Sequence, residues 1–77
     1  MILPSKIVRF EDSILAKTVY ILDNLYDSDY YISDLYKKVE NHFIDINEFI
    51  VAIDVLFVLE KIIFDEELKV IKYVKTN

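Results

Sequence analysis

Between Asn47 and Lys61 the chain reads NEFIVAIDVLFVLEK, a segment that is apolar except at its ends and at one internal carboxylate, Asp54. At about 100° per residue, this segment predicts a helix with apolar residues around nearly its whole circumference. One face collects Phe49, Ala52, Ile53, Leu56 and Leu59. We expect this face to pack on two preceding helices and to form the core of the domain.

The opposite face of the same helix is also apolar and centres on Asp54. The residues that flank this carboxylate are Ile50, Val51, Phe57 and Val58. A helix that is apolar nearly all round is normally buried all round, and a chain of 77 residues is too short to cover a second face itself. We therefore expect this outer face to bind a larger protein partner or a second copy of the chain. The alternative is that a C-terminal hairpin covers it.

The N-terminal part of the chain predicts an extended arm and a first helix. Residues 1–10 form the arm, because Pro4 disfavours helix at Leu3. Capping residues at 11–13 then begin a helix that runs to about Tyr26. Its broad apolar face consists of two adjacent stripes, Ile14, Thr18, Ile21 and Leu25, and Leu15, Val19, Leu22 and Tyr26.

A second helix follows a polar break at residues 27–29. Residues 30–32 are β-prone and suit a very short strand. Ser33 is a typical N-cap for a helix over residues 34–41, with Leu35 and Val39 facing inward. Asp45 and Glu48 have the spacing of a capping box and begin the third helix, which should continue to residue 60.

The C-terminal segment reads as two strands, residues 62–64 and 68–74, joined by an acidic turn. The turn lacks the Asn-Gly or Asp-Gly pair that marks a hairpin, so a terminal helix over residues 68–74 is the alternative. The order helix, short strand, helix, helix, hairpin predicts a mostly helical α+β fold. We expect residues 1–77 to form a single winged-helix domain, a three-helix core with a C-terminal β-hairpin.

The composition leaves little for catalysis. The chain has no glycine for a phosphate-binding loop and no cysteine for a thiolate nucleophile or a zinc site. Its one histidine, His42, has no second histidine or cysteine with which to bind a metal. We expect no enzyme activity, no cofactor and no metal.

The N-terminus does not resemble a signal peptide. The longest apolar run has eleven residues, whereas a membrane-spanning helix needs about 20. We therefore expect a soluble, cytoplasmic chain without membrane contact.

Charge argues against nucleic-acid binding. The net charge is −5, and the third helix offers only Asn47 and Lys61, at opposite ends, to DNA. Glu48 and Asp54 on that helix would repel phosphates. The runner-up is nevertheless a winged-helix transcription regulator. Its phosphate contacts would come from Lys37, Lys38, Lys69, Lys72 and Lys75.

Three features also carry a family resemblance. They are Leu3-Pro4-Ser5-Lys6 in the arm, the first helix over residues 14–25, and the pattern Phe49-x-x-Ala52-x-Asp54-x-Leu56-Phe57-x-Leu59. In this order and spacing they resemble the middle component of ABC three-component systems, of the short sixth class. The chain departs from that family in lacking a glycine at residues 60–61 and in the turn at residues 65–67.

The resemblance implies a small non-catalytic adaptor between an ABC-type ATPase, related to chromosome-maintenance and repair ATPases, and an effector protein. Such systems would act in prokaryotic defence against phages or plasmids. We expect docking through two surfaces, the arm (Leu3, Pro4, Ser5, Lys6) and the outer face of the third helix (Ile50, Val51, Asp54, Phe57, Val58). Besides the regulator, a self-contained homodimer is a further alternative.

Overall fold

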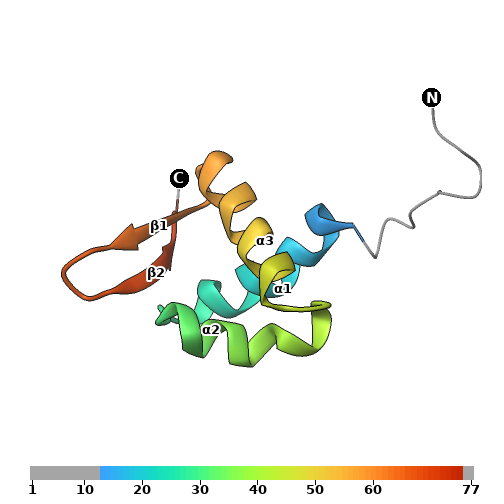
Figure 1. Cartoon of the computed structure of the whole chain (residues 1–77). Helices are drawn as coiled ribbons and strands as arrows, with labels where there is room; N and C mark the ends of the chain where they lie inside the picture. The colour runs from blue at the N-terminus through green and yellow to red at the C-terminus, as the bar shows by residue number, and fades with distance from the viewer. Residues whose placement is uncertain (1–12, 76–77) are drawn as a thin grey trace, which may run out of the picture.

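The computed structural model describes residues 13–75 and contains three α-helices followed by a β-hairpin (Figure 1). Its elements are α1 (Ile14–Asp27), α2 (Ile32–Val39), the 3₁₀ turn η3 (Glu40–His42), α3 (Ile46–Val58), β1 (Ile62–Asp65) and β2 (Val70–Tyr73). This is the mostly helical α+β, winged-helix arrangement expected from the sequence. The expected arm, residues 1–10, lies outside the described residues.

The first helix begins where the sequence predicts. The Ser13 hydroxyl accepts a hydrogen bond from the Ala16 N–H at 3.1 Å and so acts as the N-cap of α1. The helix ends at Asp27, because Ser28 takes an extended conformation at the C-cap. Of the first predicted stripe, Thr18, Ile21 and Leu25 are buried, and Ile14 packs partly against the core.

The predicted start of α2 is wrong by two residues. Ser33 is not the N-cap, because extended Tyr31 precedes a helix that already begins at Ile32. The cause is a long-range contact: Tyr30 forms a two-bond bridge with Ile71, which holds the chain extended up to Tyr31. The strand expected at residues 30–32 is reduced to this bridge. Leu35 and Val39 face the core, as predicted.

The start of α3 combines a cap with an ion pair. The Asp45 side chain accepts the Glu48 N–H at 3.0 Å, as a capping box predicts. The Glu48 carboxylate accepts the Ile44 N–H at 2.9 Å, one residue before the expected position. The same carboxylate oxygen also accepts a hydrogen bond from the Lys17 ammonium group at 2.7 Å, which joins α3 to α1.

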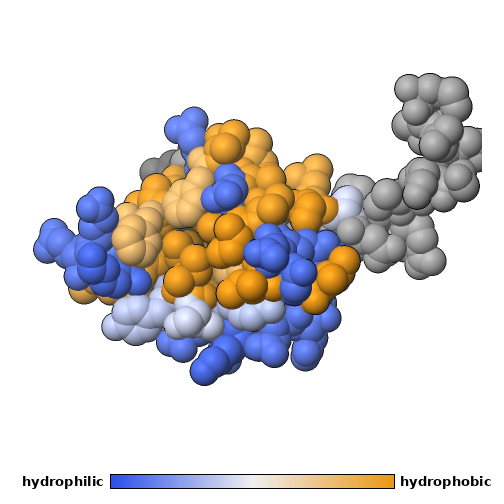
Figure 2. Space-filling model, in the orientation of Figure 1, coloured by the Kyte–Doolittle hydropathy of each residue, from blue (hydrophilic) through white to orange (hydrophobic). Residues whose placement is uncertain are grey.

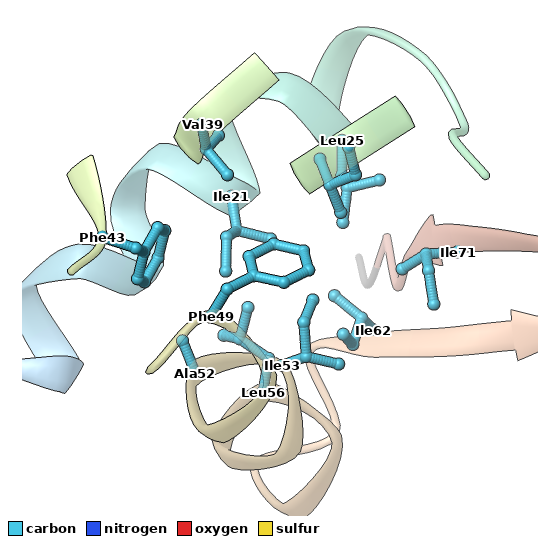
Figure 3. Close-up of a cluster of buried hydrophobic side chains, with 11 residues drawn as sticks. Ile21, Leu25, Val39, Phe43, Phe49, Ala52, Ile53, Leu56, Ile62 and Ile71 are labelled. Atoms are coloured by element: carbon cyan, nitrogen blue, oxygen red, sulfur yellow. The ribbon is translucent and has the colours of Figure 1, made fainter. Parts of the chain in front are cut away.

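The core centres on Phe49, whose ring lies 4.9 Å from that of Tyr36 and 5.6 Å from that of Phe43. Figure 3 shows this ring among the side chains of all the main elements. The buried hydrophobic residues are Ile21, Leu25, Leu35, Val39, Phe43, Phe49, Ala52, Ile53, Leu56, Ile62 and Ile71. The predicted burial of Leu59 is wrong: α3 ends at Val58, and Leu59, its C-cap, is half exposed.

The hairpin forms without glycine. β1 and β2 pair antiparallel, with Ile62 opposite Tyr73 and Asp65 opposite Val70, which rules out the alternative terminal helix. In the turn, the Asp65 carboxylate accepts the N–H groups of Glu67 and Leu68, both at 3.0 Å. Lys69 closes the turn in the left-handed region at φ 61°.

Glu60 takes the place where helices commonly end with glycine. Its N–H bonds to the Phe57 carbonyl, and the Lys61 N–H bonds to the Leu56 carbonyl, which together form a Schellman motif. Glu60 lies at φ 59°, in the left-handed region. The turn from α3 into β1 therefore places a residue with a side chain in a conformation that favours glycine.

We expect Glu60→Gly to stabilise the domain. A left-handed conformation costs a residue with a side chain roughly 1–2 kcal/mol, and the greater freedom of glycine in the unfolded chain offsets part of the gain. The net gain should be about 0.5–1 kcal/mol, measured as a higher midpoint of thermal unfolding by circular dichroism. Glu66→Gly is the control, because Glu66 does not have a positive φ. Equal midpoints for the two variants would contradict the argument.

Candidate functional site

The outer face of α3 lies at the surface, and the hairpin does not cover it. Val58 is 80% exposed and Val51 is 48% exposed, while Ile50, Asp54 and Phe57 are also exposed. Figure 2 shows an apolar surface over the region where Figure 1 places α3, interrupted by isolated hydrophilic residues. The hairpin instead packs at the end of the core through Ile62 and Ile71. The surface positions predicted for this face are thus found, and they lie together.

Asp54 stands within this apolar face without an ion pair or a side-chain hydrogen bond to any residue of the described part of the chain. Two other carboxylates form short ion pairs, Glu48 with Lys17 at 2.7 Å and Asp65 with Lys72 at 3.2 Å. A carboxylate in an apolar setting is more stable when a donor pairs with it. The face therefore offers one polar contact to whatever covers it.

A groove lies beside the outer face, between α2 and the first turns of α3. It has a volume of about 340 Å³. Its lining consists of Ile32, Ser33, Tyr36, Lys37, Glu40, Ile46, Phe49 and Ile50. Ile50 belongs to both the groove and the outer face, so the two surfaces are continuous. Sequence reasoning missed the groove, because it depends on how two helices pack.

A third apolar surface runs along α1. The second stripe predicted for this helix is largely exposed, with Leu15, Val19 and Tyr26 each more than half accessible to solvent. Leu22 alone in that stripe packs partly against the core. Contiguous exposed apolar surface is unusual on a monomeric protein and marks interaction sites.

The lysines named for DNA contact are only partly available. The Lys72 ammonium lies 3.2 Å from an Asp65 carboxylate oxygen and 3.9 Å from one of Asp29. The Lys75 ammonium lies 5.6 Å from the centroid of the Tyr26 ring. Two of the five lysines therefore already have contacts within the domain.

No group of three histidine, cysteine, aspartate or glutamate residues within residues 13–75 is placed to hold a metal ion. His42 stacks on Tyr20, with ring centroids 3.6 Å apart and planes 4° from parallel. In the same part of the chain no helix has the length and apolar character needed to cross a membrane. The arm residues expected to dock, Leu3 to Lys6, lie outside the described residues.

Glu48 joins α3 to α1 through its ion pair with Lys17. The hydrogen bonds from Lys17 and from the Ile44 N–H lower the pKa of this carboxyl below its ordinary value of 4.5. Backbone and Lys72 hydrogen bonds lower the pKa of Asp65 in the same way. A lowered pKa means that the folded state favours the ionised form.

A family model described as "ABC-three component (ABC-3C) system Middle Component 7" matches residues 3–71. The match confirms the resemblance to a middle component. The matching family is Middle Component 7, so the sixth class expected from the sequence is not confirmed. No curated protein and no solved structure gives a significant match.

Glu48→Gln should destabilise the domain at neutral pH and spare it in acid. Because the folded-state pKa is lowered, the ionised carboxyl contributes stability above pH 4.5, and this contribution is lost as the pH falls through the folded-state pKa. We expect a loss of about 1 kcal/mol at pH 7, measured by urea unfolding between pH 3 and 7. Glu66→Gln, in the exposed turn, is the control. A loss that does not shrink in acid would refute the role of the charge.

Proposed function

Since the chain belongs to the Middle Component 7 family of ABC three-component systems, we propose that it is a non-catalytic adaptor that joins an ABC-type ATPase to an effector protein. The proposed setting is prokaryotic defence against phages or plasmids, in the cytoplasm, where the ATPase finds its nucleotide. The adaptor would act mechanically, holding the effector near the ATPase until the ATPase changes state.

The exposed outer face of α3 is the observation that carries this proposal. In a DNA-binding winged helix, the third helix presents donors such as Arg, Lys, Asn or Gln to the bases. Here its exposed side presents Val51, Phe57, Val58 and the carboxylate Asp54. Covering an apolar side chain completely contributes roughly 1.5–3 kcal/mol before the costs of association. The face is suited to a protein surface that brings one donor to Asp54.

The charges support the adaptor over the transcription regulator. Lys72 is held between Asp29 and Asp65, and the chain carries a net charge of −5. Phosphate contacts need free cations. A homodimer that uses the same face is the other alternative, and sedimentation of the isolated chain distinguishes it from a monomer that awaits a different partner.

Substitution on the two sides of α3 tests the docking face. We expect Val51→Asp and Val58→Asp to abolish binding to the other components of the system, measured by co-purification, while thermal unfolding changes little. Leu56→Asp is the comparison, because Leu56 is buried in the core and a charge there should unfold the domain. If Val51→Asp unfolds the domain as severely as Leu56→Asp, the outer face is ordinary core and the arm becomes the better docking candidate.

The isolated chain should bind DNA weakly or not at all at physiological salt. The reason is the acidic surface and the apolar exposed side of α3. Fluorescence anisotropy with a labelled duplex, at low salt and at about 0.15 M salt, measures this. Sub-micromolar affinity with a steep salt dependence would favour the regulator instead.

A further inference from the structure

We propose that the groove between α2 and α3 receives a large apolar side chain from a basic amphipathic helix of the partner, which places a lysine or arginine against Asp54. This inference rests on the proposed docking function and specifies the chemistry of the partner. It concerns a surface, the groove, that the docking-face variants do not test.

The groove is shaped to take an apolar anchor. Ile46 and Ile50, one turn apart on α3, form one wall, and Ile32 and Tyr36, one turn apart on α2, form the other. Phe49 forms the buried floor. At about 340 Å³, the groove lies near the lower end of the range of roughly 300–1,000 Å³ that is usual for ligand pockets. It therefore suits one or two large side chains.

The floor of the groove is closely packed. The Phe49 side chain is completely buried and lies beside Phe43 in the core (Figure 3). Its ring also packs against the ring of Tyr36. The walls, in contrast, leave their apolar atoms exposed: Ile46 is 52% exposed, and Ile32 and Ile50 are close to 40%. A partner side chain that enters the groove buries the exposed apolar atoms of these walls, which favours binding.

The position of Asp54 determines the charge of the occupant. Ile46, Ile50 and Asp54 follow one another at every fourth residue, so they form one stripe with steps of about 6 Å along α3. The α2 rim carries one charge of each sign, Lys37 and Glu40. Since these two charges cancel, the net negative charge of the groove and the outer face together comes from Asp54. This carboxylate has no partner among residues 13–75.

The spacing favours a helix as occupant. A partner helix advances about 5.4 Å per turn, which matches the step from the groove at Ile50 to Asp54. An apolar anchor and a basic residue three or four positions apart would then meet both sites at once, the usual arrangement of a helix in a groove. A second copy of this chain fits poorly, because a two-fold axis through the centre of the outer face brings together two Asp54 carboxylates, and the face itself has no lysine or arginine to pair with them.

Two groove variants with matched controls test the anchor. Ser33→Trp fills the groove from α2, and Lys38→Trp places the same side chain outside it. Ile46→Asp removes an apolar wall, and Ile63→Asp makes the same substitution at an equally exposed residue of β1, outside the groove. Binding of the full chain to each of the two other components, the purified ATPase and the purified effector, is measured by biolayer interferometry. We expect the groove variants to bind at least about tenfold more weakly and the controls to stay within about twofold.

The outcomes separate this inference from the proposed function. Normal binding by both groove variants, with binding lost in Val51→Asp, overturns the groove and leaves the docking face in place. Normal binding by Val51→Asp as well overturns the docking face itself. Circular dichroism of each variant confirms that the domain is folded.

Photo-crosslinking identifies the occupant. Benzoylphenylalanine in place of Ile50 should crosslink to a helical segment of the partner with a lysine or arginine three or four residues from a large apolar residue. Asp54→Lys should weaken binding, and reversing the charge of that partner residue should restore it. Crosslinking to a second copy of this chain, or a charge reversal that restores nothing, overturns the proposed partner chemistry.

Discussion

The burial of Phe49 orients α3, the carboxylate of Glu48 secures its first turn, and most of the surface follows from this orientation. One oxygen accepts both the Ile44 N–H, at the entrance of the helix, and the Lys17 ammonium group of α1. The Asp45 cap holds the first turn at the same point. With the start of α3 tied in this way, Phe49 and the residues at helical spacing from it face the core. Asp54 and its apolar neighbours then necessarily face outward.

The amount of apolar surface left outside follows from the size of the domain. Within residues 13–75, more large apolar side chains are exposed than hydrophobic residues are buried. Two short strands cover only the end of the core, through Ile62 and Ile71, and one helix of eight residues, α2, covers its side. Within residues 13–75, little chain remains to cover the outer face or the groove. Family membership is consistent with this exposed apolar surface, because a middle component belongs to a system with other components.

Local sequence patterns predicted most of the fold but not the contacts between elements. The Ser13 and Asp45 caps and the inward stripes of α1 and α3 follow from spacing within one helix, and the structure confirms them except at Leu59, which is exposed, and at Ile14, which is partly buried. The start of α2 was misplaced because the Tyr30–Ile71 bridge joins residues far apart in the chain. The exposed positions of the outer face could be predicted from the helical wheel. The groove could not, since it exists only where two helices meet.

The chain builds its tight turns with Glu60 and Lys69 in the left-handed conformation and contains no glycine at all. Residues with side chains have fewer backbone conformations than glycine, so the connections between the elements are comparatively stiff. Association loses affinity when loops and side chains must be ordered on contact. A scaffold without glycine has less of this freedom to lose when it is bound. In the docking role that we propose, the small domain would present its exposed apolar faces in a preorganised form, and a larger share of the contact free energy would remain for binding.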